Sequence, residues 1–376
     1  MRVASRRASG SRRWARRAAI ARAREILYIW PPLQSIASAR RASRPTRARR
    51  YSRSKVRMAR TKLGNDTLGW IGTGRMGFPM AARLAKAGGK VAAYNRTRAK
   101  AEPLAEYGVD VVGTPADLAD RDIVFTMVSA SKDLLDVTLG AEGVLSRSDR
   151  APKILIDCST VSEEASAELR AAAAKRGTAL LAAPVSGNGK VVKAGKLSLV
   201  VSGPEAAFEA ARPYLECLGT GVSYVGEGEL SRIVKICHNV FLGVVIQSLV
   251  EITVLAEKSG VPRHAFLDFI NKSVMGSTFT RYKTPALVNL DFTTTFTPPL
   301  LRKDMDLGLS AARALDVPMP VASAAREIIQ SLIGNGYRDT DFATLIELQA
   351  RNSGLRLKPE NVAVSDGLQP AADKAV

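Results

Sequence analysis

A lysine and an asparagine four residues apart form the first pair of side chains in this sequence that could do chemistry together. Lys235 and Asn239 would share one face of a helix, because residues at positions i and i+4 are neighbours on a helix surface. Most helix lysines are solvated, but residues 233–237 around this one are otherwise apolar, which indicates a largely buried helix. Burial beside a second positive charge lowers the pKa of a lysine toward neutrality, where proton transfer is most efficient. Lys235 is therefore a candidate acid–base residue.

A glycine-rich segment forms a second chemically suggestive pattern. It follows an apolar run at residues 68–72 and opens a helical pattern. Gly72 permits a tight turn, Gly74 lets the backbone approach a pyrophosphate, and Gly77 lets the helix pack on the strand. The N-terminus of the helix offers N–H groups and a partial positive charge to the phosphates. The segment therefore predicts a dinucleotide site, with candidate residues Gly72, Gly74, Arg75, Met76 and Gly77.

The end of the second predicted strand indicates which dinucleotide would bind. An acidic side chain there would accept a hydrogen bond from the adenosine ribose 2′-hydroxyl, but this sequence reads Tyr94-Asn95-Arg96-Thr97-Arg98. The two guanidinium groups suit a 2′-phosphate, and Thr97 could donate to it as the next helix begins. The alternative is an ordinary basic helix start. The pattern favours NADP(H), with NAD(H) as the second choice.

The excess of basic residues lies almost entirely at the N-terminus. Of the 55 Lys/Arg and 35 Asp/Glu in the chain, residues 1–62 hold 20 and one, so the remaining residues are nearly neutral. Three interpretations of this basic, disordered leader stay open: a mitochondrial or plastid transit peptide, a nucleic-acid-binding tail, and an upstream extension with Met58 as the true start. A transit peptide would place the protein in an organelle matrix. Otherwise we expect a cytoplasmic protein.

Several kinds of site are not expected. The three cysteines lack CxxC spacing, so they predict neither a disulfide framework nor a zinc site, and they fit a reducing compartment. With only two histidines, a histidine-based metal site is not expected either. Polar side chains such as Gln247 and Glu251 interrupt the most apolar stretch, residues 240–256. That stretch therefore predicts a buried helix and no membrane contact.

The elements that must position these residues alternate between strand and helix. Predicted strands cover residues 68–72, 90–94, 110–113, 123–127, 154–157 and 179–182, with further β-rich stretches at 197–201 and 222–225. Predicted helices lie between them, the first over residues 75–87 and the next ending near Tyr107. Strands separated by helices form a parallel sheet covered on both faces. The fold class is therefore α/β, beginning with a Rossmann-like doubly wound sheet.

The pattern becomes purely helical after Gly228. One long helix is predicted over residues 229–259, and Pro262 starts another. Helices with short proline-containing connections continue to about Gly336. We expect four parts: the leader, a dinucleotide-binding Rossmann domain, an all-α C-terminal domain and a flexible tail, over residues 1–62, 66–228, 229–354 and 355–376.

Five separated segments, in this order, resemble the β-hydroxyacid dehydrogenase family of 3-hydroxyisobutyrate dehydrogenase-like oxidoreductases. They are GWIGTGRMGFPM (69–80), IDCST (156–160), APVSGNGKVVKAGKL (183–197), VKICHN (234–239) and LLRKDMDLGL (300–309). The resemblance covers roughly residues 68–354. It implies an NAD-binding domain of the 6-phosphogluconate dehydrogenase type. It also implies an NAD(P)-dependent dehydrogenase or reductase that moves a hydride between nicotinamide and a small hydroxy acid or its semialdehyde.

The resemblance also implies roles for the matching residues. Lys235 matches the general acid/base, and Asn239 matches the asparagine that orients lysine and substrate. Ser186 and Gly187 match the pair that holds the substrate carboxylate, with Asn188 next to them. The cofactor-binding set comprises the residues named above, with Asn95, Arg96 and Thr97, together with matches near the nicotinamide at Met127, Val128, Ser129, Thr160 and Lys303. The helical domain would mediate a homodimer or homotetramer.

Departures from the family pattern leave the substrate open. The family usually continues Ser-Gly-Gly and then a Gly-Ala pair, where this chain has Asn188 and Val191-Val192. These larger side chains could narrow the carboxylate pocket. One alternative is a reductase of small aldehydes or tartronate semialdehyde in the same family. Another is a non-catalytic nucleotide-binding module whose basic leader binds nucleic acid. Since non-catalytic relatives tend to lose the lysine at 235, we favour an enzyme without a nucleic-acid partner.

Overall fold

The structure is a computed structural model that describes residues 63–368 of the chain. The predicted basic leader, residues 1–62, and the end of the predicted tail, residues 369–376, lie outside the described residues. The three interpretations of the leader therefore stay open.

Six strands form one parallel sheet in the order β3-β2-β1-β4-β5-β6. Their bounds are β1 Thr67–Ile71, β2 Lys90–Tyr94, β3 Asp110–Val111, β4 Ile123–Thr126, β5 Ile154–Asp157 and β6 Ala179–Ala182. The strand order reverses between β1 and β4, and in such sheets the carboxyl ends beside this point form the ligand crevice. The prediction of a doubly wound Rossmann-like sheet is confirmed.

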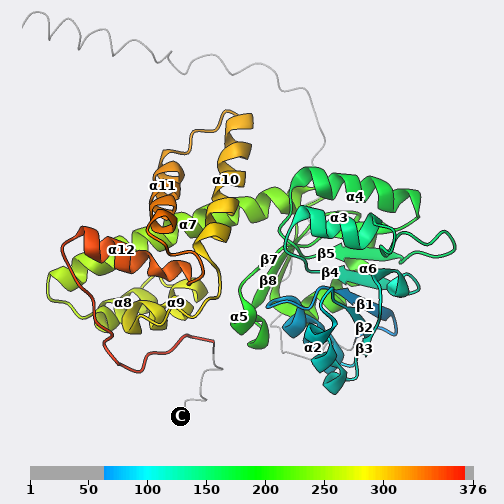
Figure 1. The fold of residues 1–376 in the computed structure, drawn as a ribbon, viewed down its shortest axis with the longest axis horizontal. Helices are drawn as coiled ribbons and strands as arrows, with labels where there is room; N and C mark the ends of the chain where they lie inside the picture. The colour runs from blue at the N-terminus through cyan, green and yellow to red at the C-terminus, as the bar shows by residue number, and fades with distance from the viewer. Residues whose placement is uncertain (1–62, 369–376) are drawn as a thin grey trace, which may run out of the picture. The chain divides into compact units, whose positions relative to one another are not determined.

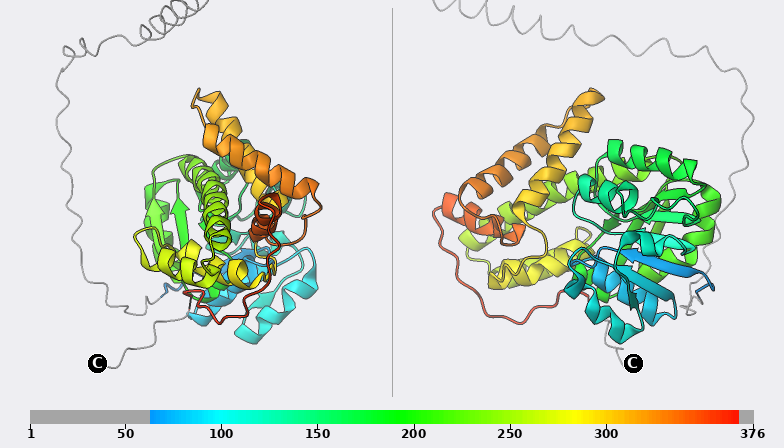
Figure 2. Two further views of the ribbon diagram at one scale, coloured as in Figure 1. Left: turned by 90° about the vertical axis from the view of Figure 1, so that its left-hand side faces the viewer. Right: turned by 45° about the vertical axis from the view of Figure 1, so that its right-hand side comes forward.

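Helices cover both faces of this sheet (Figures 1 and 2). They are α2 Gly77–Lys86, α3 Ser131–Leu139, α4 Glu163–Lys175 and α6 Glu205–Leu218. Because successive strand residues point to opposite faces, Leu68 and Trp70 of β1 join a core with α2 and α6. Ile71 joins a second core with α3 and α4. The strands are thus enclosed, and their carboxyl ends remain available for a ligand.

The predicted helix that ends near Tyr107 is the clearest difference in this part of the chain. Two 3₁₀ turns, Arg98–Lys100 and Glu102–Tyr107, stand in its place. Pro103 explains the change, because proline has no N–H to donate and its ring clashes with the preceding turn of an α-helix. The first helix also begins later than predicted, at Gly77, because residues 73–76 form the turn that follows β1.

A second, smaller sheet in the order β7-β8-β9 follows the first. Its strands are β7 Val185–Ser186, β8 Leu197–Val201 and β9 Gly219–Tyr224. A short helix, α5 Gly189–Lys193, connects β7 to β8. This sheet places Ser186 at the end of β7.

Residues 230–352 are helical with short connections, as the sequence predicts. The helices are α7 Leu230–Lys258, α8 Arg263–Lys272, α9 Thr278–Asn289, α10 Pro298–Ala314, α11 Pro320–Gly334 and α12 Leu345–Asn352. Among the described helices, α7 is long and apolar enough to cross a membrane. It nevertheless buries the polar side chains of Arg232 and Gln247 and packs against α8, α10, α11 and α12, as the core helix of a folded domain does.

Residues 355–368 contain no helix or strand, yet they differ from the flexible tail that we predicted. Leu368 is buried, and Leu355 and Leu357 pack against the helical core. The Glu360 carboxylate accepts hydrogen bonds from the backbone N–H groups of Arg263 and His264 at the start of α8. Short sequence patterns do not reveal these contacts, because the partners lie almost a hundred residues away.

Candidate active site

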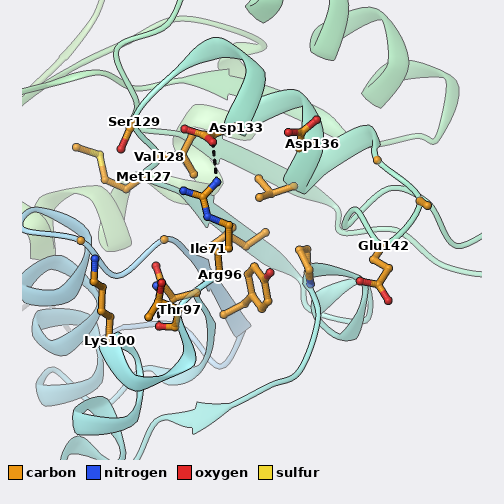
Figure 3. Close-up of a pocket in the computed structure, with 18 residues that line it drawn as sticks. Ile71, Arg96, Thr97, Lys100, Met127, Val128, Ser129, Asp133, Asp136 and Glu142 are labelled. Atoms are coloured by element: carbon orange, nitrogen blue, oxygen red, sulfur yellow. Dashed lines mark hydrogen bonds and ion pairs between the residues drawn. The ribbon is translucent and has the colours of Figure 1, made fainter.

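A cleft with a volume of about 750 Å³ lies at the carboxyl ends of β1, β2 and β4 (Figure 3). Most of the predicted cofactor-binding residues line it: Gly72, Gly74, Asn95, Arg96, Thr97, Met127, Val128 and Ser129. Arg75, Met76, Gly77, Thr160 and Lys303 are not among its lining residues. Eight predicted residues from three separate segments of the sequence thus line one continuous cleft.

The glycines of the turn occupy positions that larger residues could not. Gly72 has a φ of +97°, and a Cβ atom there would lie 2.3 Å from the carbonyl oxygen of Met127. A Cβ on Gly77 would lie 1.9 Å from the carbonyl oxygen of Gly72. A Cβ on Gly74, in contrast, would meet nothing within 4 Å, so this glycine leaves open space beside the backbone. This is the arrangement that a closely approaching pyrophosphate requires.

The residue between these glycines also fits a ligand. Thr73 donates its backbone N–H to Oδ1 of Asn95 at 2.9 Å, which ties the turn to the end of β2. The hydroxyl oxygen of Thr73 is buried and has no hydrogen-bond partner among the described residues. Buried polar groups are normally hydrogen-bonded. The turn therefore presents a polar group that a dinucleotide could satisfy.

The basic residues after β2 differ in whether they face the cleft. Arg96 is exposed and reaches toward α3, where its guanidinium lies 3.2 Å from the carboxylate of Asp133 (Figure 3). Arg98 points elsewhere, because it donates to the carbonyl oxygens of Val111 and Val112. Lys100, which is not one of the predicted site residues, lines the cleft as well. Arg96 and Lys100 are thus the cations of this cleft that could meet a phosphate.

Lys235 and Asn239 are brought together as predicted. Lys235 is 9% exposed, and its Nζ donates to Oδ1 of Asn239 at 2.8 Å. Nδ2 of Asn239 in turn donates to Oδ2 of Asp304 on α10 at 2.6 Å. Lys303 forms an ion pair of 3.2 Å with the other oxygen of Asp304. The four side chains form one polar network in an otherwise apolar helix interface.

The surroundings of Lys235 lower its proton affinity. Desolvation lowers the pKa of Lys235 to about 8, and the charge of Lys303 acts in the same direction. The Asp304 carboxylate opposes both effects. A lysine with this pKa exchanges protons near neutral pH, whereas a solvated lysine stays protonated.

A buried arginine fixes the start of α7 and so positions Lys235 one turn later. Arg232 is 2% exposed, and its guanidinium lies 2.5 Å from the carboxylate of Asp157 at the end of β5. It also donates to the carbonyl oxygen of Ser159 at 2.6 Å and to Ser166 on α4. No sequence pattern marked this residue, since an arginine near a helix start is usually solvated.

The predicted carboxylate-binding residues lie at the end of β7. The hydroxyl of Ser186 is 2.8 Å from Nε2 of His238. His238 lies on α7, as Lys235 does. Gly187 has a φ of +136°, where other residues would be strained. Oδ1 of Asn188 accepts the N–H groups of Lys190 and Val191 and so caps α5. His238 was not among the predicted site residues, although it is next to Asn239 in the sequence.

Two family models match adjoining parts of the chain. The model described as the NAD binding domain of 6-phosphogluconate dehydrogenase matches residues 67–226. The model described as NAD-binding of NADP-dependent 3-hydroxyisobutyrate dehydrogenase matches residues 229–349. Together they cover the α/β part and nearly all of the helical part.

Known proteins resemble the chain over the same region. It is 30% identical to chloroplastic glyoxylate/succinic semialdehyde reductase 2 of Arabidopsis thaliana, over 77% of this chain and 80% of that protein. It is 29% identical to mitochondrial 3-hydroxyisobutyrate dehydrogenase of Drosophila melanogaster, over 83% and 98%. A crystal structure of 3-hydroxyisobutyrate dehydrogenase from Salmonella typhimurium superposes with a TM-score of 0.68 at 25% identity, over 75% and 99%.

Proposed function

Because the chain belongs to the β-hydroxyacid dehydrogenase family of NAD(P)-dependent oxidoreductases, we propose that it interconverts a small hydroxy acid and its semialdehyde, with Lys235 as general acid/base. The observation that carries this proposal is the buried Lys235–Asn239 pair, whose Nζ–Oδ1 distance is 2.8 Å. A lysine that is buried and hydrogen-bonded in this way contributes little to solubility, and it is placed to transfer protons in a dehydrogenase.

The residues of the cleft fit the dinucleotide that the family uses. Gly74 leaves room for the pyrophosphate, and the unpartnered hydroxyl of Thr73 lies in the same turn. Arg96, Thr97 and Lys100 would hold a 2′-phosphate, which supports a preference for NADP(H) over NAD(H). When bound, the nicotinamide accepts a hydride from the alcohol carbon or returns one to the carbonyl carbon.

Lys235 would handle the proton that accompanies this transfer. In the reductive direction, protonated Nζ donates a proton to the carbonyl oxygen of the substrate. In the oxidative direction, neutral Nζ accepts the proton of the hydroxyl group. Asn239 holds Nζ at 2.8 Å through its side-chain oxygen, and Asp304 fixes the asparagine by accepting from its Nδ2 at 2.6 Å. The network thus restricts the lysine to one position.

The substrate class follows from the segment at the end of β7. The Ser186 hydroxyl and the backbone N–H groups of Gly187 and Asn188 can donate hydrogen bonds to a carboxylate. The relatives named above are named for glyoxylate, succinic semialdehyde and 3-hydroxyisobutyrate, all of which carry a carboxylate. We therefore propose a short carboxylate-bearing aldehyde or hydroxy acid as substrate, processed in the cytoplasm or in an organelle matrix.

We further propose that the protein is a homodimer or homotetramer assembled through its helices. Phe241 of α7, Leu255 of α7 and Phe269 of α8 are each about two-thirds exposed, at 68%, 67% and 67%. Large apolar side chains on one set of helices are typical of a surface that another copy covers. Sedimentation analysis of the purified protein tests this, and a monomer at micromolar concentration would contradict it.

A substrate panel tests the proposed reaction. The purified protein is mixed with NADPH or NADH and with glyoxylate, succinic semialdehyde or tartronate semialdehyde, and the oxidative direction is assayed with the matching hydroxy acids and 3-hydroxyisobutyrate. We expect turnover of at least one carboxylate substrate, faster with the NADP(H) pair at low cofactor concentration. Binding of NADPH without turnover of any of these compounds would contradict the proposal.

A further inference from the structure

The imidazole of His238 lies between the proposed carboxylate-binding serine and the lysine network. Its Nε2 is 2.8 Å from Oγ of Ser186, and its Nδ1 is 2.9 Å from Oδ1 of Asn239. The family resemblance assigned no role to this histidine. It is nevertheless the residue through which β7 and the polar network of α7 are connected.

The hydrogen-bonding partners of Asn239 determine which ring nitrogen carries the proton. Nδ2 of Asn239 donates to the carboxylate of Asp304 at 2.6 Å, so the amide oxygen faces Lys235 and His238. An amide oxygen only accepts hydrogen bonds. Nδ1 of His238 must therefore donate, and in the neutral ring Nε2 carries the lone pair.

The consequence for Ser186 depends on the charge of the ring. Nε2 of a neutral His238 accepts a hydrogen bond from the hydroxyl of Ser186. That hydroxyl then has no hydrogen left to donate to a carboxylate, a group that only accepts hydrogen bonds. Protonation reverses this contact: Nε2–H donates to Oγ, and the hydroxyl proton of Ser186 becomes free. The imidazolium also adds a positive charge beside the carboxylate.

We propose that His238 is a positioning residue that controls whether Ser186 can donate to a substrate carboxylate. Carboxylate substrates then bind more tightly when His238 is protonated, and neutral aldehydes do not. This inference rests on the proposed function, because it requires that Ser186 binds the substrate carboxylate.

The groups around the ring of His238 act on its pKa in both directions. Although His238 retains solvent access, protein atoms crowd its ring, and this desolvation, followed by the charge of Lys235, lowers the pKa of His238 below its ordinary value of 6.5. The hydrogen bond to Asn239 acts in the opposite direction. On α10, Asp304 accepts a hydrogen bond from Asn239, and Lys303 pairs with Asp304. From β7, the uncharged Ser186 contacts the ring.

A kinetic comparison provides the first test. KM for succinic semialdehyde and for butanal, a neutral aldehyde of the same chain length, is measured with saturating NADPH between pH 5 and 7.5. We expect KM for succinic semialdehyde to rise about tenfold over this range, the effect of one hydrogen bond to a charged group. KM for butanal should stay constant. Lys235 remains largely protonated over this range, because its pKa is about 8.

Two variants separate the role of His238 from a general effect of pH. His238→Asn keeps a donor of similar reach but cannot titrate, so its KM for succinic semialdehyde should not change with pH. His264→Gln is the matched control, because His264, on α8, is the other histidine of the chain and pairs with Glu360 in the segment that follows α12. It should retain the wild-type pH profile. A pH-dependent KM in His238→Asn, or a flat one in the wild type, would overturn the proposal.

A spectroscopic test does not depend on turnover. In the full chain labelled with ¹⁵N-histidine, His264→Gln leaves the ring-nitrogen signals of His238 alone. We expect the Nδ1-protonated tautomer at pH 7.5 and a higher pKa of His238 when 4-hydroxybutyrate is added together with NADPH, because binding and protonation are linked. The other tautomer, or a pKa that 4-hydroxybutyrate does not change, would refute the inference. If the expected signals appear while no aldehyde is reduced, the proposed reaction is wrong and the role of His238 stands.

Discussion

Arg232 and Asp157 form a buried ion pair, 2.5 Å long, that joins the first turn of α7 to the carboxyl end of β5. Both side chains are almost inaccessible, with exposed fractions of 2% and 0%. Asp157 also accepts hydrogen bonds from the hydroxyl of Thr126 and the N–H of Ser159. The helix that carries Lys235 is therefore attached to the sheet that forms the cofactor cleft.

We predict that Asp157→Asn lowers the free energy of unfolding by roughly 3–5 kcal/mol, because removal of one partner leaves a buried charge uncompensated. Urea unfolding followed by circular dichroism measures the change. Asp268→Asn is the control, since it breaks the exposed Asp268–Lys272 pair and should cost less than about 1 kcal/mol. Equal losses of unfolding free energy in the two variants would show that the buried pair stabilises the fold no more than an exposed pair does.

Asp304 and Lys303 should move the pH profile of the reaction in opposite directions. Reduction requires protonated Lys235, so its rate should fall as the pH rises through about 8. The carboxylate of Asp304 raises the pKa of Lys235 and the charge of Lys303 lowers it. In Asp304→Asn the fall should therefore begin at lower pH, and in Lys303→Met at higher pH.

The measurement is kcat for aldehyde reduction at saturating substrate and NADPH between pH 6 and 10. The oxidative direction supplies an internal check, because it requires neutral Lys235 and should gain rate over the range in which reduction loses it. Shifts of both variants in the same direction would be incompatible with this electrostatic account.

Replacement of Arg96 should weaken NADPH binding selectively. Arg96→Ala removes a cation from the cleft, so we expect the Kd for NADPH to rise by roughly ten- to a hundredfold while that for NADH changes little. Quenching of intrinsic fluorescence by each cofactor gives the two constants. Arg98→Ala is the matched control, because Arg98 already donates to the carbonyl oxygens of Val111 and Val112. Similar effects of the two substitutions would argue against a phosphate contact at Arg96.

Asp133 should weaken the binding of NADPH. Its carboxylate lies 3.2 Å from Arg96 and lines the same cleft, so it competes with a phosphate for the guanidinium. In Asp133→Asn we expect the Kd for NADPH to fall a few-fold, and the gain should shrink at high salt, which screens exposed charges. Isothermal titration calorimetry at two ionic strengths checks this prediction, and weaker binding by the variant would reverse our interpretation of the pair.

The sequence predicted the main elements where local patterns are strong. The strands at residues 90–94, 154–157 and 179–182 have the predicted bounds, because each is an apolar run between turn signals or helical patterns. The glycine turn was also predictable, since its function depends on residue spacing. Lys235 and Asn239 meet as predicted because one helical turn separates them.

Contacts between distant segments could not be predicted from sequence patterns. Arg232 meets Asp157 across 75 residues, and Ser186 meets His238 across 52. No local periodicity encodes such pairs, which depend on how α7 and β7 pack. Pro103, in contrast, is a local residue that argues against an α-helix after β2, although the apolar spacing around it predicted one.

Loss of the Lys235 amine tests the central claim most directly. We predict that Lys235→Ala reduces kcat/KM by at least about a hundredfold, the usual contribution of a general acid/base, while the Kd for NADPH stays within about twofold. Added ethylamine should restore part of the rate. Lys258→Met, at the far end of the same helix, should behave like the wild type. A Lys235→Ala variant that turns over at a near-normal rate would contradict the proposed role of this lysine.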